Sequence, residues 1–140
     1  MNAKEFLNQY RNKYEEIKKT RAQIISLWAT LQAVNNDGMP KADGVSDRVG
    51  TLASELADTE LYYDWLIDEL ELIRGEILNV VERVPDSLQA AMLTNRYIGL
   101  ESWPLIAEQL YISESYARGK LHKKALAQVQ KILDERELER

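Results

Sequence analysis

A cluster of cationic and hydroxyl side chains between residues 113 and 131 is the part of the sequence best suited to bind a charged partner. This stretch holds Arg118, Lys120, Lys123, Lys124 and Lys131 against a single acid. Lysine and arginine bind phosphates, and arginine and serine also hydrogen-bond the edges of bases. The composition therefore favours recognition of nucleic acid, and a merely solvated basic helix face is the alternative.

The sequence offers little for catalysis or metal binding. It has no cysteine, and its one histidine, His122, lies among lysines. The acids of 55–71 lack the Glu-x-x-His spacing of di-iron bundles, and Asp37, Asp43 and Asp47 lack the spacing of a calcium loop. No glycine-rich phosphate loop or nucleophile elbow is present. We therefore expect a protein that is not an enzyme and has no metal, cofactor or small-molecule substrate.

The basic stretch follows the signals of a helix-turn-helix. Ser102 is a suitable N-cap for a short helix, Trp103 to Leu110, whose Ile106, Ala107 and Leu110 face inward. Tyr111 and Ile112 form the turn, in which we expect the Ile112 side chain to be buried. Ser113 caps the next helix, and Glu114 lies at the positive end of that helix. The inward stripe of that helix is Ala117, Leu121, Ala125 or Leu126, Val129, and Ile132 or Leu133.

A recognition helix of this kind presents its exposed side chains to the major groove of double-stranded DNA. Gly119 would allow a close approach to the sugar-phosphate wall. The predicted DNA-binding residues are Ser113, Ser115, Tyr116, Arg118, Gly119, Lys120, His122, Lys123 and Lys124.

A third helix is expected before this module, from Leu88 to Ile98. Val84-Pro85-Asp86-Ser87 breaks the preceding helix, and Pro85 suits a helix start. Gly99 is placed to close the helix at the C′ position, which usually takes a left-handed residue.

The first 84 residues read as an antiparallel coiled-coil hairpin, with helices from Ala3 to Val34 and from an N-cap at Ser46. Between them, residues 35–45 contain an Asn/Asp/Gly cluster and a proline. The first stripe is Leu7, Tyr10, Tyr14, Ile17, Arg21, Ile24, Trp28 and Leu31. The second is Val49, Leu52, Leu56, Thr59, Tyr63, Leu66, Leu70, Ile73, Ile77 and Val80.

When the two stripes are paired in an antiparallel hairpin, the residue numbers of the two partners add up to 80 in every layer, as for Leu7 and Ile73. The polar pair Arg21 and Thr59 then shares one layer, and we expect Arg21 to reach toward Glu55, Asp58 or Glu60. Ile77 and Val80 overhang the first helix and should dock the carboxy-terminal module.

A second stripe, Leu61, Trp65 and Leu72, lies off the seam among acids. We interpret it as a partner-binding surface, because long two-helix hairpins rarely bury enough apolar surface alone. Scattered surface aromatics are the alternative.

Charge and composition bound the remaining possibilities. The net charge is −5, and residues 1–84 account for it with 10 Lys/Arg and 15 Asp/Glu. An acidic body repels DNA, so we expect weak binding by one copy and tighter binding by a homo-oligomer or a partner-assisted complex. No apolar run is long enough to span a membrane and no secretory signal is visible, which predicts a cytoplasmic protein.

Three segments of the module resemble region 4 of sigma factors, and most closely the sigma-like phage regulators of the ArpU and RinA type. They are Leu93-Thr-Asn-Arg-Tyr-Ile98, Ser102-Trp-x-x-Ile-Ala-x-x-Leu-x-Ile-Ser113 and Leu121-His-Lys-Lys-Ala-Leu126. The resemblance implies promoter binding by the 113–124 helix and allows contact with RNA polymerase. Tyr111 stands where that family often has glycine, and one extra residue precedes Ala125.

We therefore predict an all-α protein with a hairpin arm over 1–84 and a DNA-binding module over 85–140. The favoured function is a phage-encoded transcription regulator that activates late genes. A protein-interaction or assembly factor with a structural helix-turn-helix, resembling a small terminase subunit, is the alternative.

Overall fold

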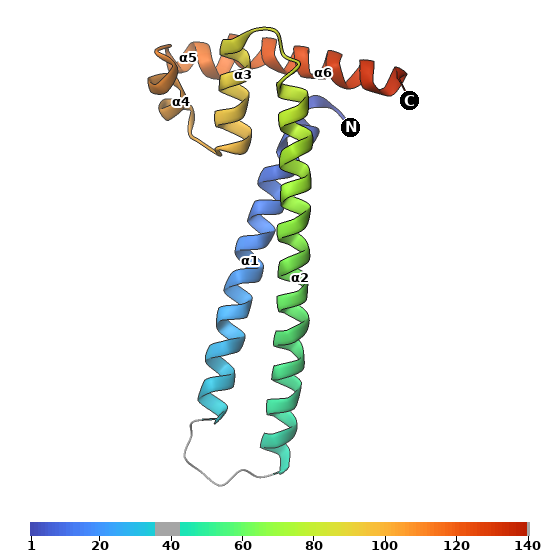
Figure 1. Cartoon of the computed structure of the whole chain (residues 1–140). Helices are drawn as coiled ribbons and strands as arrows, with labels where there is room; N and C mark the ends of the chain where they lie inside the picture. Colours follow the sequence, from blue (N-terminus) through green and yellow to red (C-terminus); the bar gives the residue numbers. More distant parts are fainter. Residues whose placement is uncertain (36–42, 140) are drawn as a thin grey trace. The chain divides into compact units, whose positions relative to one another are not determined.

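The computed structural model describes the backbone of residues 1–35 and 43–139, which is all-α (Figure 1). A long antiparallel hairpin of two helices is followed by a small helical module, as predicted. No helix of this described part is long and apolar enough to cross a membrane. The elements are α1 (Ala3–Asn35), α2 (Asp43–Val81), α3 (Ser87–Leu93), η1 (Thr94–Ile98), α4 (Trp103–Leu110), α5 (Glu114–Tyr116), η2 (Ala117–Leu121) and α6 (His122–Leu138), where η1 and η2 are π-helical.

The start of α1 is capped by reciprocal hydrogen bonds. The Glu5 N–H donates to Oδ1 of Asn2 at 2.8 Å, and the Asn2 N–H donates to Oε2 of Glu5 at 3.3 Å. The start predicted for α2 was wrong, because the helix begins at Asp43 and Ser46 lies inside it. The loop expected between the two helices falls largely on residues 36–42, which lie outside the described part of the chain.

The seam predicted for α2 is confirmed along its whole length. Every residue of the stripe from Val49 to Val80 is buried or half-buried, whereas most positions between them are exposed. Apolar residues at steps of three and four along a helix form one continuous face, so this stripe marks the packed side of α2.

The seam predicted for α1 is only half right. Tyr10, Ile17, Ile24 and Leu31 do face inward, but Tyr14, Arg21 and Trp28 are exposed. The residue just before each of these three takes its place: Lys13 and Leu27 are half-buried, and Thr20 is buried. The predicted and the observed stripe share Leu7, Tyr10, Ile17, Ile24 and Leu31, and both consist of steps of three and four, so spacing alone does not separate them.

The exchange of Arg21 for Thr20 has a physical reason. Thr20 is short, and its hydroxyl is satisfied within the helix by donating to the Glu16 carbonyl at 2.9 Å. Arg21 stays exposed and donates from Nη2 to the Tyr63 hydroxyl at 3.1 Å. It does not pair with Glu55, Asp58 or Glu60 as expected, since no ion pair of Arg21 exists among the described residues.

The chain divides into two compact units, residues 13–69 and residues 1–12 with 70–140. In the first unit, Tyr62 donates to the Glu16 carboxylate and the Lys13 ammonium lies 5.1 Å from the Trp65 ring centroid. Both contacts lie within a turn of the predicted pairing. This unit holds 6 Lys/Arg and 11 Asp/Glu, and so carries the whole net charge of −5.

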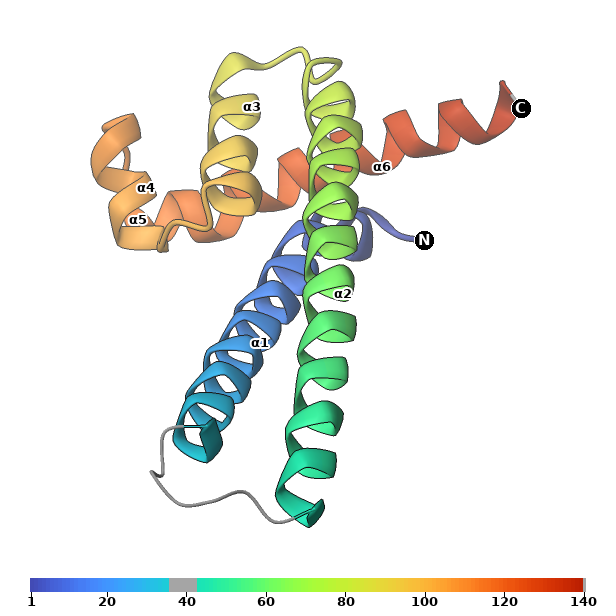
Figure 2. The same cartoon turned by 60° about the horizontal axis from the view of Figure 1, so that its bottom comes forward.

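The second unit has a core drawn from both ends of the chain. Ile77 and Val80 are buried in it, which confirms their predicted docking role. Ala3, Phe6 and Leu7 of α1 belong to the same core, which was not foreseen. The first turn of α1 lies beside α6 (Figures 1 and 2), and the Ala3 N–H donates to Oε1 of Gln130 at 2.8 Å. Residues 1–12 and 70–84, assigned to the arm, therefore share a compact unit with the module.

The segment that precedes the helix-turn-helix differs from the prediction at both ends. Asp86 is the N-cap of α3, accepting from the Leu88 and Gln89 N–H groups at 2.8 and 3.1 Å, and Pro85 lies before it. At the other end, Gly99 has φ −71° and Leu100 is the left-handed residue, with φ 54°. Position 99 requires glycine because the backbone of Asn95 lies so near that a Cβ at residue 99 would be 2.8 Å from the Asn95 carbonyl oxygen.

Removing a side chain from this shared core should destabilise the unit that carries the module. Leu7 is fully buried, so Leu7→Ala should lower the free energy of unfolding by about 2–5 kcal/mol. Ile25→Ala, at an exposed site of the same helix, should change it by less than about 1 kcal/mol. Urea unfolding followed by far-UV circular dichroism measures both, and equal effects would show that α1 is not part of the core.

Candidate nucleic-acid interface

The two helices on either side of the turn, α4 and α5, both begin at the predicted serine caps. The Ser102 hydroxyl accepts from the Leu105 N–H at 3.4 Å, and the Ser113 hydroxyl accepts from the Tyr116 N–H at 3.1 Å. Between them, Tyr111 adopts the left-handed conformation with φ 57° and ψ 42°. The Ile112 N–H donates to the Ala107 carbonyl at 3.0 Å, which completes a Schellman-type ending of α4. The turn thus uses a strained residue where glycine would be free of strain.

The helix after the turn runs without interruption through α5, η2 and α6. Its buried stripe is Ala117, Leu121, Ala125, Val129 and Ile132, so Ala125 rather than Leu126 is the fully buried alternative. Steps of four residues drift by about 40° each around an α-helix. The wider π-turn of η2 offsets this drift over residues 117–121.

Most of the predicted DNA-binding side chains are exposed along this helix. They are Ser113, Ser115, Tyr116, Arg118, Gly119, Lys120, Lys123 and Lys124. Glu114, Ser115, Arg118 and Gly119 line a shallow, open depression. The opposite face of the same helix is buried in the core, so this surface is presented on a fixed support.

Two features of this surface bear on what it can bind. Among the described residues, Arg118 is paired with Glu114 at 3.0 Å, whereas Lys120, Lys123 and Lys124 form no ion pair within 4.0 Å. Both partners of the Arg118 pair are substantially exposed, and such pairs add little stability. A Cβ at Gly119 would meet nothing within 4 Å, so the protein's own packing does not require glycine there.

His122 was wrongly predicted to face outward. Its ring is half-buried between Tyr97, at 5.9 Å between centroids, and Trp103, at 4.8 Å and edge-on. A hydrogen bond of 2.6 Å joins Nε2 to the Tyr97 hydroxyl. The partial burial of His122 could not be predicted from its sequence neighbours, which are lysines, because its aromatic partners come from η1 and α4. His122 therefore helps to hold the helix in place and cannot present its ring to a groove.

The second predicted surface is exposed as well. In residues 13–69, Leu61 and Trp65 are exposed on α2, and Tyr62 stacks on Trp65 with 5.8 Å between centroids. Leu72, in the other unit, is also exposed. Their role in binding a partner stays a prediction.

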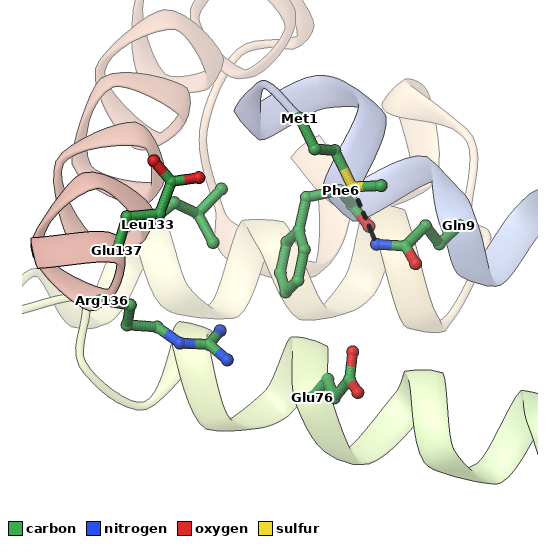
Figure 3. Close-up of a pocket in the computed structure, with 7 residues that line it drawn as sticks. All are labelled: Met1, Phe6, Gln9, Glu76, Leu133, Arg136 and Glu137. Carbon is green, nitrogen blue, oxygen red and sulfur yellow. Dashed lines mark hydrogen bonds between the residues drawn. The ribbon is translucent and has the colours of Figure 1, made fainter. Parts of the chain in front are cut away.

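A pocket of about 220 Å³ was not foreseen from the sequence, because α1, α2 and α6 all contribute to it. Figure 3 shows Phe6 and Leu133 on its wall, and Glu76 of α2 and Arg136 of α6 also line it. Gln9 donates from Nε2 to the Phe6 carbonyl at 3.0 Å and to the Met1 sulfur at 3.3 Å. We assign no ligand to this pocket. The described residues also contain no group of three or more metal-binding side chains.

Comparison of the chain with protein-family models, curated proteins and solved structures finds no match. The resemblance to sigma factor region 4 and to phage regulators therefore stays a prediction.

The environment of His122 predicts how stability depends on pH. Burial lowers the pKa of His122 below 6.5, and the charges of Lys4 and Arg96 lower it further. The unfolded chain then takes up a proton before the folded one, so stability is lost as the pH falls below about 6.5 and through the folded pKa. Thermal unfolding at about pH 7.5 and pH 5 should show a larger loss for the wild type than for His122→Phe, which keeps an aromatic ring. Equal losses would contradict this assignment.

Proposed function

We propose that the protein is a sequence-specific, double-stranded-DNA-binding transcription regulator. The observation that carries the proposal is the exposed face of the helix that begins at Glu114. There Gly119, with open space at its Cβ position, is followed by three lysines that form no ion pair with any described residue. A helix that follows a tight turn and is anchored on its other face can enter the major groove. Phage late-gene activation is the regulatory role that we take from the sequence resemblance.

The side chains divide by what they could contact. Ser115 and Arg118, beside Gly119 in the open depression, can hydrogen-bond base edges. Lys120, Lys123 and Lys124 are flexible point charges suited to phosphates. His122 is left out of the interface, because its ring holds the helix against Tyr97 and Trp103.

The charge distribution limits the affinity of a single copy. Residues 1–12 and 70–140 hold 12 Lys/Arg and 12 Asp/Glu, so the unit with the DNA-binding helix is neutral overall. Long-range attraction to DNA is therefore weak and binding depends on local contacts. We include in the proposal a second copy on an adjacent half-site or assistance from RNA polymerase, since either raises the effective affinity.

A protein-assembly role is the competing function, and the exposed Leu61 and Trp65 favour it. In that role the helix-turn-helix would be structural and its lysines would simply be solvated. The two functions differ in whether the protein binds DNA in a salt-dependent way.

Salt titration of DNA binding tests the proposal. About four phosphate contacts should give a log-log slope of affinity against salt of roughly −3 to −4. Lys120→Glu with Lys123→Glu should abolish binding of a labelled mixed-sequence duplex, measured by fluorescence anisotropy. Lys18→Glu with Lys19→Glu, exposed on α1 in the other unit, is the matched control and should bind like the wild type. The assembly role would be favoured if the wild type shows no salt-sensitive binding.

A glycine exchange separates groove binding from folding. Gly119→Ala should raise the free energy of unfolding by about 0.5–1 kcal/mol, because alanine favours helix over glycine. Its methyl group should nevertheless weaken specific DNA binding by roughly tenfold, about 1.4 kcal/mol, where the helix meets the sugar-phosphate wall. Gly75→Ala in α2 meets nothing within 4 Å either and should stabilise without any change in binding. Unchanged binding by Gly119→Ala would remove Gly119 from the interface.

A further inference from the structure

The corrected seam of α1 leaves a stripe of large side chains exposed on the same helix. Tyr14, Ile25 and Trp28 are 39%, 64% and 47% exposed. Lys18 and Arg21, both exposed, lie between Tyr14 and Ile25. The five residues follow one another at steps of four, three, four and three, which keeps them on one side of the helix as in a coiled-coil seam. Large apolar side chains gathered in this way on a surface indicate a contact with another chain.

The unit that carries this stripe, residues 13–69, buries little apolar surface by itself. Of its residues that the structure describes, Ile17, Leu56 and Leu66 are the buried apolar ones. More large apolar side chains are exposed there than buried, namely Tyr14, Ile25, Trp28, Leu61, Tyr62, Trp65 and Ile67. A hairpin with so small a core is marginal alone and gains stability when another surface covers it.

One hydrogen bond shows which sides of the two helices lie together. Tyr62 donates to the Glu16 carboxylate, so the flank of the α2 seam that holds Tyr62 lies beside the flank of the α1 seam that holds Glu16. At about 100° per residue, the exposed α1 stripe is on the flank opposite Glu16. By the same count, the α2 flank opposite Tyr62 consists of Ala53, Ala57, Glu60, Asp64 and Ile67, all of them exposed. The two stripes therefore share one side of the hairpin.

These two stripes match each other across a twofold axis that runs parallel to the helices. Such an axis sets α1 of one copy antiparallel to α2 of the other, at the same level as within one copy. Pairs that touch within a copy have residue numbers that add up to 78 or 84, as for Glu16 with Tyr62 and Arg21 with Tyr63. Between copies, five successive layers add up to 81 or 82: Tyr14 with Ile67, Lys18 with Asp64, Arg21 with Glu60, Ile25 with Ala57, and Trp28 with Ala53.

The chemistry of the layers is complementary. Three layers are apolar, and in two of them a large side chain of α1 meets an alanine of α2. In the other two layers a cation meets an acid. Among the described residues of one copy, Arg21, Glu60 and Asp64 form no ion pair within 4.0 Å, and Lys18 only approaches Glu15 at 3.9 Å. Exposed ion pairs set orientation more than affinity, which the apolar layers would supply.

We propose that this side of the hairpin, formed by the stripes 14–28 of α1 and 53–67 of α2, is a dimer interface occupied by a second copy of the same chain. The surface predicted from the sequence is less suited to this role, because the Trp65 ring already lies against Lys13 and Tyr62 of its own copy. The dimer would supply the second copy for an adjacent half-site. That use rests on the proposed function, but the pairing of the hairpins needs no DNA.

The mass of the full chain in solution tests the interface. Sedimentation equilibrium should give twice the 16.2 kDa of one chain for the wild type. Tyr14→Glu with Trp28→Glu should raise the dissociation constant of the dimer by roughly 100-fold, because four acidic side chains replace aromatic contacts in the twofold interface. The matched control is Leu61→Glu with Trp65→Glu, which adds the same charge to exposed positions of the same hairpin and should stay dimeric. Far-UV circular dichroism should be unchanged in both variants, since all four positions are exposed.

Charge exchange tests the register of the dimer. Arg21→Glu alone and Glu60→Arg alone each place like charges in one layer and should weaken the dimer roughly tenfold. The variant that combines them should return to within about threefold of the wild type, because the opposite charges meet again. A combined variant that is weaker than either single one would contradict the proposed layers.

The outcomes keep this inference apart from the proposed function. A wild type that remains monomeric at high micromolar concentration would overturn the inference, and the exposed stripe would then be open to a different protein. Equal dissociation of the Leu61→Glu/Trp65→Glu control would also overturn it, because the other side of the hairpin would be the interface. A dimer that is lost in Tyr14→Glu/Trp28→Glu but does not bind DNA would support the inference and contradict the proposed function.

Discussion

Burial of the first turns of α1 against α2 and the module is the constraint on which the candidate interface depends. A helical module of about 55 residues buries only a small fraction of its surface and is marginal alone. Ala3, Phe6 and Leu7 add an apolar layer to the core that also contains Ile77 and Val80. This core fixes the inward face of the helix from Glu114 onward and, by doing so, determines which side chains remain exposed.

Net charge also differs between the two compact units. Residues 13–69 carry the whole negative balance, so the unit with the candidate interface has no net charge of its own. Within that unit, four of the 12 acids lie between Asp134 and Glu139, and four of the 12 Lys/Arg lie between Arg118 and Lys124. A neutral unit with separated charges favours short-range and oriented contacts over long-range steering.

Local signals made much of this fold predictable from the sequence. The α2 stripe, the α4 boundaries and the caps at Ser102 and Ser113 depend on residues within one or two turns, and the structure confirms them. The misplaced features depend on distant residues. His122 is half-buried by aromatics from η1 and α4. The α1 seam contains Thr20 in place of Arg21 because burying an unpaired guanidinium is costly, and the spacing of apolar residues does not report that cost.

The departures from ideal local structure gather around the candidate interface. Leu100 and Tyr111 have positive φ on either side of α4, and η2 inserts a π-turn directly after α5. Left-handed residues other than glycine and π-turns are both unfavourable, and they persist only where surrounding packing imposes them. Tyr111 has no packing role that would explain it, since its side chain is 95% exposed. The core built from both ends of the chain therefore stabilises a turn and a helix whose geometry local energetics alone would not select, and such sites are where binding functions concentrate.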